Sequence, residues 1–241
     1  MPLPKIYVPT YELKVPSTGE TIRVRPFSVK EEKLLLIAIE SKDKNTVIDT
    51  VKQIINNCIV DGDLNLEKLP FYDVDFIFIF LRAKSIGETV EIRMTCNNVL
   101  DNGNVCNNVF EADLDIANCE VVKDKTVEND IKLDSVNGLK MKYPSYSVMK
   151  RLESNTNVDL TTSMIVNSID YIYNGKEIHP SKDYTKEELK EFVENLTEAQ
   201  YKKLEHYVTN FPTFVVKLEA TCTKCGFHHK VRYSDFYDFF F

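Results

Sequence analysis

The sequence contains little glycine and no tryptophan. Only 7 of its 241 residues are glycine, and histidine occurs at four positions. The chain has no glycine-rich phosphate-binding loop, no HExxH zinc-protease motif and no nucleophile elbow of the G-x-S-x-G type. These absences argue against nucleotide-dependent and hydrolytic catalysis. We therefore expect a protein that is not an enzyme and has no small-molecule substrate.

The chain also lacks membrane-spanning and secretory signals. No apolar run approaches the roughly 18 residues that a bilayer span requires, and the segment MPLPKIYVP lacks the basic-then-apolar order of a signal peptide. The formal net charge of -7 argues against nucleic-acid binding, which needs a concentrated basic face. We expect a protein of the cytoplasm with no membrane or nucleic-acid partner.

Two stretches of the chain resemble each other. Residues 11–27 and 129–144 each read as two short strands about a turn, followed by a helix that begins at Ser28 or Ser147. Each half then continues through helical sequence to a strand that ends at a cysteine. Such self-similarity indicates a duplicated unit. We predict an α+β fold of two related lobes, each with a β-hairpin, helices and a cysteine-tipped strand. The predicted lobes are residues 1–113 and 114–241.

Capping signals predict helices in both halves. Ser28 and Glu31 have capping-box spacing before an apolar run at 34–39, and we expect that helix to be buried on most sides. The run at 71–85 is rich in aromatic and β-branched residues, which allows a strand or a helix. We choose the helix, because the segment at 197–200 caps a clear helix at the equivalent place in the second half.

The middle of the second half carries a further helical pattern. Apolar residues recur at helical spacing from Leu160 to Ile172, which predicts one buried helix face over this range. The sequence Tyr173-Asn-Gly-Lys176 follows and is a strong signal for a tight turn. We therefore expect the helix to extend to this turn.

Four of the six cysteines form two pairs. Cys222 and Cys225 flank two residues and precede a glycine, which is the pattern of a metal-binding knuckle. Cys96 and Cys106 are separated by a loop that contains Asn102-Gly103. Without a secretory signal, paired cysteines favour a metal site over disulfides. We predict a structural, zinc-ribbon-like Cys₄ site with one pair from each lobe; the alternative is a set of reduced thiols without metal.

A site of four thiolates has no open coordination position for water, so a zinc ion here would stabilise the fold without catalysing a reaction. His228 could replace one sulfur, although a histidine in a strand after a knuckle is more often a surface or packing residue. Cys58 lies on an apolar helix face and is predicted to be a core residue. Cys119 is expected to have a similar packing role.

Several segments together resemble a known family. They are Pro16-Ser-Thr-Gly-Glu20, Arg25-Pro-Phe27, Lys30-Glu-Glu-Lys33 and the run from Tyr72 to Glu88. With the cysteine strand behind them, these residues resemble the baseplate hub protein family of T-even-like bacteriophages with contractile tails. The resemblance covers the first hundred residues best. It reaches the second half through the cysteine knuckle and the aromatic C-terminus.

The resemblance implies a non-enzymatic protein of the tail baseplate, at or near the central hub, that contacts other baseplate and hub proteins during tail assembly. It would be found in the virion, and in the host cytoplasm during assembly. One alternative stays open. The chain could be an assembly chaperone for the hub that is absent from the mature virion.

Two regions are candidates for these contacts. Basic residues around the first hairpin, among them Arg25 and Lys30, and the acidic Asp73 and Asp75 near the aromatic run form either a solvated surface or charge-paired contacts with neighbouring subunits. Large aromatic side chains dominate interface hot spots, and the C-terminus is rich in them. That segment either folds onto the protein's own core or inserts into a partner. Its predicted contact residues are Phe236, Tyr237, Phe239, Phe240 and Phe241.

Overall fold

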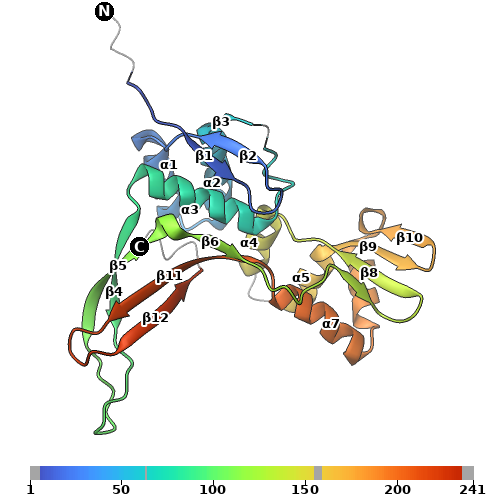
Figure 1. Cartoon of the computed structure of the whole chain (residues 1–241). Helices are drawn as coiled ribbons and strands as arrows, with labels where there is room; N and C mark the ends of the chain where they lie inside the picture. The colour runs from blue at the N-terminus through green and yellow to red at the C-terminus, as the bar shows by residue number, and fades with distance from the viewer. Residues whose placement is uncertain (1–5, 63, 155–158, 235–241) are drawn as a thin grey trace, which may run out of the picture.

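A computed structural model describes residues 6–62, 64–154 and 159–234 of the chain. Helices and several small antiparallel sheets alternate along it, as Figure 1 shows. The mixed α+β class predicted from the sequence is therefore confirmed.

The first half of the chain begins with a three-stranded sheet in the order β1-β2-β3 and ends with the separate antiparallel pair β4-β5. Its strands are β1 (Tyr11–Lys14), β2 (Thr21–Val24), β3 (Ile59–Asp61), β4 (Thr89–Thr95) and β5 (Val109–Asp115). Its helices are α1 (Val29–Glu40), α2 (Lys44–Cys58) and α3 (Phe71–Ser85). The segment at 71–85 is thus a helix, as chosen from the sequence.

The second half follows a 3-10 turn, Ile116–Asn118. Its strands are β6 (Glu120–Val122), β7 (Asp130–Lys132), β8 (Asn137–Met141), β9 (Ile169–Asn174), β10 (Glu177–Pro180), β11 (Thr213–Thr221) and β12 (His228–Tyr233). Its helices are α4 (Tyr146–Ser154), α5 (Leu160–Ser168), α6 (Lys186–Glu194) and α7 (Glu198–Thr209), and a second 3-10 turn spans Ser181–Asp183. The strands form sheets in the orders β10-β9-β8-β7 and β12-β11-β6.

The order of elements is similar in the two halves. In the first, the pair β1-β2 precedes α1 and α2, and the next strand, β3, pairs antiparallel with β2. In the second, the pair β7-β8 precedes α4 and α5, and the next strand, β9, pairs antiparallel with β8. Each half then places a helix before a final antiparallel pair, β4-β5 or β11-β12. The cysteine pairs lie at the connections within these final pairs.

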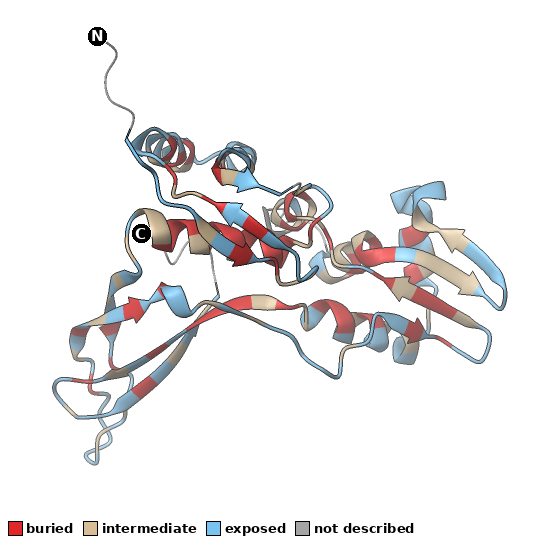
Figure 2. Ribbon diagram, turned by 45° about the horizontal axis from the view of Figure 1, so that its top comes forward, coloured by how far each residue is buried: buried red, intermediate tan, exposed pale blue. Residues whose placement is uncertain are grey.

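Three clusters of buried apolar residues form the interior (Figure 2). The first lies among β1, β2 and helices α1 to α3, and it also takes Tyr146 and Met149 from α4. The second lies between the pairs β4-β5 and β11-β12, and the third lies between the β7-β10 sheet and helices α5 to α7. Helix α4, which belongs to the second predicted lobe, therefore packs into the core of the first. The division into lobes at residues 113 and 114 stays a prediction.

Helix α3 is apolar around most of its circumference because it contributes to two cores. Phe78 belongs to the first cluster, whereas the adjacent Ile79 belongs to the second. Neither side chain has any exposed surface. Because α3 has no continuous solvent-facing stripe, its sequence lacks the polar face that would have distinguished a helix from a buried strand.

Two expectations about helices are wrong. Helix α1 is not buried on most sides, because Leu36 and Ile37 are exposed to 48% and 63%. The helical face predicted from Leu160 to Ile172 is also too long. Helix α5 ends at Ser168, and the chain continues as strand β9, whose pairing with β8 outweighs the helical spacing of the apolar residues.

Candidate metal centre

The two final antiparallel pairs bring four cysteines together. Cys96 follows β4 and Cys106 precedes β5, while Cys222 and Cys225 lie in the connection between β11 and β12. Figure 1 shows both pairs projecting to the same end of the molecule. All four sulfurs lie within 4.8 Å of one another. The structure therefore gathers every cysteine of the set predicted from the sequence.

Backbone hydrogen bonds fix the knuckle of the second pair. The Cys222 N–H donates to the Phe227 carbonyl at 2.9 Å, and the Gly226 N–H donates to the Cys222 carbonyl at 3.0 Å. Gly226 has a φ of +72°, which glycine adopts without the steric cost that a Cβ would add. The glycine after the second cysteine is therefore what allows the tight turn.

The longer loop of the first pair is fixed in a similar way. The Cys96 N–H donates to the Asn108 carbonyl and the Cys106 N–H to the Asn98 carbonyl, both at 2.8 Å. Asn107 has a φ of +49° and occupies the place after the cysteine that Gly226 has in the knuckle. Asparagine is among the residues that tolerate this conformation best after glycine. Two loops of different length thus present their sulfurs in a comparable geometry.

The sulfur positions fit a tetrahedral metal ion. A Zn–S bond of about 2.3 Å implies sulfurs roughly 3.8 Å apart around a tetrahedron. The Cys96 and Cys225 sulfurs are 3.6 Å apart, and the Cys106 and Cys222 sulfurs are 4.0 Å apart. Cys96, Cys106 and Cys222 are buried, and Cys225 is half-buried. The four cysteines could therefore hold a metal ion largely shielded from solvent.

Polar side chains surround three of the four sulfurs. The Asn98 amide donates to Cys225 Sγ at 3.6 Å, and the Asn108 amide donates to Cys222 Sγ at 3.5 Å. His229 is buried, and its Nε2 lies 3.3 Å from Cys96 Sγ. N–H groups directed at thiolates offset the negative charge that four such ligands bring to a site.

Sequence reasoning named His228 and missed its neighbour. His228 is exposed on β12 and contacts Glu219, whereas His229 faces the cysteines. Successive strand residues point to opposite faces, so only one of the two histidines can face the site. The register that pairs His229 with Ala220 decides which one it is, and the sequence does not show that register.

The local environment acts on the thiol pKa values in opposite directions. Burial raises the pKa of the Cys96 thiol to about 12. Burial would also raise the pKa of Cys222, but the N–H groups of Cys225 and Lys224, together with the Asn108 amide, lower it to about 6. The knuckle therefore favours a thiolate at Cys222, whereas the Cys96 thiol would release its proton to solvent when a metal ion bound its sulfur.

The two remaining cysteines lie outside this cluster. Cys58 is fully buried in the first core, as predicted. Cys119 packs against the second core, and burial raises its pKa to about 12. Both thiols therefore act as apolar packing groups.

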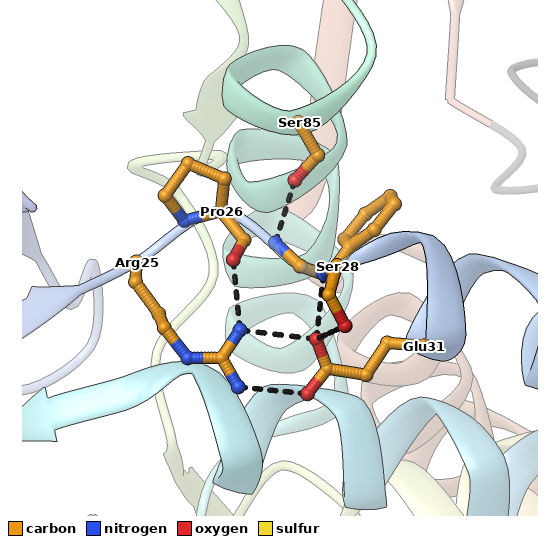
Figure 3. Close-up of polar contacts among 6 residues, drawn as sticks. Arg25, Pro26, Ser28, Glu31 and Ser85 are labelled. Atoms are coloured by element: carbon orange, nitrogen blue, oxygen red, sulfur yellow. Dashed lines mark hydrogen bonds and ion pairs between the residues drawn. The ribbon is translucent and has the colours of Figure 1, made fainter. Parts of the chain in front are cut away.

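The predicted contact residues Arg25 and Lys30 differ in their surroundings. The Arg25 guanidinium donates to both carboxylate oxygens of Glu31 at 2.8 and 3.0 Å and to the Pro26 carbonyl at 2.9 Å (Figure 3). The same Glu31 carboxylate accepts from the N–H and hydroxyl of Ser28. Arg25 is therefore committed to an internal network, whereas Lys30 is exposed on α1.

Asp73 and Asp75 are buried, which corrects their expected place at the surface. Asp73 has no exposed area, and its carboxylate accepts from the Ser17 N–H at 3.1 Å. Burial raises its pKa above the ordinary value. Both aspartates lie in the first two turns of α3, which are covered by the hairpin β1-β2 and by helix α4.

The aromatic contacts predicted at 236–241 lie outside the described residues.

Comparison with known proteins identifies the family. The profile described as T4 bacteriophage base plate protein matches residues 8–241. This chain belongs to that family. The match confirms the resemblance to T4-like baseplate proteins and extends it over both halves, including all four cysteines of the cluster. Searches of curated proteins and of solved structures found no match.

Membership implies a place in the phage tail and contacts with other tail proteins. Within the part of the chain that the structure describes, no helix has both the length and the apolar character needed to cross a bilayer.

Proposed function

We propose that this baseplate protein is a structural subunit at or near the central hub of the tail, where it contacts other baseplate and hub proteins without catalysing a reaction. The family match over residues 8–241 is the observation that carries this proposal. The closed Cys₄ cluster supports it, because four sulfur ligands around one ion exclude a substrate from the metal.

The proposed ion is zinc, and its role is to join segments that are distant in sequence. Cys96 and Cys106 come from one half of the chain, whereas Cys222 and Cys225 come from the other. The second core beneath the site is built from only a few strands and one face of α3. A metal ion that links the two hairpins adds binding free energy to folding where the core is small.

The surrounding donors suit a permanently bound ion. Asn98, Asn108 and His229 direct polar nitrogen atoms at three sulfurs. Donation to a thiolate holds the ligand in place and lowers its tendency to exchange. The proposed site therefore stabilises the hairpins for the lifetime of the particle.

Quantitative mass spectrometry of purified mature particles and of the assembly intermediates before them tests the structural role. A structural subunit is expected in fixed, near-integer copy number per tail in both samples. Presence in the intermediates alone would contradict the structural role and establish the alternative, an assembly chaperone for the hub made in the host cytoplasm. Absence from both samples would contradict both roles.

A further inference from the structure

A cleft lies between the β7-β10 sheet and helix α6, far from the cysteine cluster. Its volume of about 550 Å³ falls in the range of about 300–1,000 Å³ that ligand pockets occupy. Leu189 and Phe192 of α6 and Ile172 of β9 form part of its apolar lining. Leu189 is buried, whereas Phe192 and Ile172 are only half-buried. The cleft therefore leaves apolar surface open to solvent.

Aromatic rings stand along this cleft. Tyr173, His179, Tyr184 and Phe192 all line it. Tyr184 is 40% exposed, and its hydroxyl lies 2.9 Å from His179 Nδ1, which fixes the two rings relative to each other. Grooves lined by aromatic rings bind extended, proline-rich segments. The lining of this cleft is of that kind.

Two carboxylates, Asp134 and Glu188, also line the cleft, and none of the described lining residues is a lysine or arginine. Hydrogen bonds from Asn137 and Val136 lower the pKa of Asp134. The N–H and hydroxyl of Thr185 lower the pKa of Glu188. Both groups are thus ionised at neutral pH, and within the described part of the chain neither is paired with a cation. The cleft therefore carries negative charge that only neutral donors hold in place.

The charged residues around the cleft are mostly acidic as well. Residues 174–200 contain seven acidic residues and four lysines. One of these lysines, Lys190, is paired with Glu194 along α6. Because opposite charges steer association and like charges oppose it, the cleft favours an occupant that is apolar and basic.

The sequence before β1 has this character, and we call residues 1–10 the N-terminal arm. The arm contains three prolines and one basic residue, Lys5, but no acidic residue. Ile6 and Tyr7 are exposed to 88% and 86%, and residues 6–10 belong to no helix or strand. Proline restricts φ to values that suit an extended chain, so a proline-rich segment loses little conformational freedom when it binds.

We propose that the N-terminal arm of one copy docks in the cleft of a second copy of this chain. Ile6 and Tyr7 lie against the aromatic and apolar lining, and Lys5 lies beside Asp134 and Glu188. Figure 1 shows the arm joining β1 on the side of the first core that faces away from β9 and β10, so the contact joins two chains. Reciprocal docking produces a dimer, and head-to-tail docking produces a ring.

Photo-crosslinking of the purified full-length protein tests the docking. The crosslinking amino acid p-benzoylphenylalanine replaces Tyr7, and the same amino acid at Val60, exposed to 53% on β3, is the matched control. Isotopically light and heavy copies are mixed, so that a crosslink between two copies can be recognised. We expect mixed-isotope crosslinks to α6 or β9 from the first position and not from the control.

Three results of this experiment would overturn the proposal. They are a crosslink confined to one chain, a crosslink to another surface of the second copy, and no crosslink at concentrations where the protein associates.

Analytical ultracentrifugation provides the second measurement. The wild type should associate as its concentration rises, and a protein that stays monomeric up to about 1 mM would overturn the proposal. An arm variant, Ile6→Ser with Tyr7→Ser, should raise the dissociation constant about tenfold or more. Its melting curve should match that of the wild type, because both side chains are exposed.

A cleft variant, Asp134→Asn with Glu188→Gln, should also raise the dissociation constant about tenfold. Asparagine and glutamine keep an oxygen that accepts the hydrogen bonds of the turn and the capping box, so this variant should keep its fold, as its melting curve will show. Association as tight as that of the wild type in either folded variant would contradict the docking.

Mixing the two variants distinguishes arm-to-cleft docking from a symmetric contact. The arm variant keeps an intact cleft, and the cleft variant keeps an intact arm. The mixture should therefore form more complex than either variant alone at the same total concentration, because one arm-to-cleft contact is available. A mixture that associates no better than the separate variants would overturn the proposal.

Discussion

At the scale of single residues, the metal centre depends on small differences between neighbours. Asn107 and Gly226 both adopt positive φ after a cysteine, so the two loops bring their sulfurs together despite different lengths. His229 faces the cluster, whereas His228 faces solvent. A residue's role at this site is therefore decided by backbone conformation and strand register as much as by residue type.

Substitution of Cys222→Ser should remove most of the bound zinc and lower the free energy of unfolding by several kcal/mol, because metal binding here is part of the folding free energy. Elemental analysis and thermal unfolding measure both effects, and one zinc per wild-type chain is expected. Cys119→Ser is the matched control, since this thiol packs against the same core outside the cluster. Equal zinc content in the two variants would refute the site.

The Arg25–Glu31 network should make stability depend on pH. The Arg25 guanidinium, with help from Ser28, lowers the pKa of Glu31 from 4.5 to about 2. The folded state thus favours the ionised carboxylate, so its contribution is fully present above pH 4.5 and is lost as the pH falls toward 2. The contribution is on the order of 3 kcal/mol.

Glu31→Gln should therefore remove part of the loss of stability between pH 4.5 and 2, as measured by denaturant unfolding across this range. Glu32→Gln, which removes a carboxylate from the same turn, should leave the pH dependence close to that of the wild type. Identical pH profiles for wild type and Glu31→Gln would show that the network contributes nothing.

At the scale of elements, the second hairpin depends on a close approach of two strands. Gly138 lies on β8 opposite Tyr173 of β9. A Cβ at Gly138 would collide with the Tyr173 ring and lie 2.8 Å from the Ile131 carbonyl of β7. The glycine therefore allows the central strand of this sheet to pack against both neighbours.

We expect Gly138→Ala to lower the free energy of unfolding by about 1–3 kcal/mol through overpacking. Adding Tyr173→Ser should recover part of this loss, because it removes the Tyr173 ring, which is the larger obstacle. Recovery should be incomplete, because the Ile131 carbonyl remains close to the new Cβ. Chemical denaturation of the single and double variants provides the comparison. A single variant as stable as the wild type would mean that the strands can separate without cost.

At the scale of the whole molecule, aromatic side chains connect the first and third cores. Phe211, which follows α7, lies with its ring centroid 5.7 Å from those of Phe71 and Tyr143 and 5.5 Å from that of Tyr207. Phe71 begins α3 of the first core, whereas Tyr207 belongs to α7 of the third. The contacts with Tyr143 and Tyr207 are edge-to-face, and such contacts stabilise beyond the area that they bury.

Replacing Phe211 by alanine should lower stability by about 2–4 kcal/mol and separate the unfolding of the third core from that of the first. Differential scanning calorimetry should then show two transitions. Phe76→Ala is the control, because Phe76 packs against the first core alone; it should destabilise without separating transitions. If both variants unfold with the same calorimetric profile, Phe211 does not couple the first and third cores.

Local patterns in the sequence were sufficient for several elements. The capping boxes at Ser28 and Thr197 begin helices where their spacing indicates. The cysteine pairs indicated the metal-site candidate, because the ligands of such a site are recognisable by type and spacing. These features depend on residues close together in the chain, which is why they can be read from it.

Only the tertiary structure decided which surfaces meet. The apolar run of α1 predicted burial, but the first core covers one side of the helix and leaves the other exposed. Asp73 is fully buried because the turn between β1 and β2 covers the start of α3. Apolar periodicity shows that a side chain favours burial, whereas the distant segments that reach it determine whether it is buried. The sequence by itself determined where several helices begin, the hairpins and the cysteine set, and the packing of distant segments decided where α5 ends and which surfaces are covered.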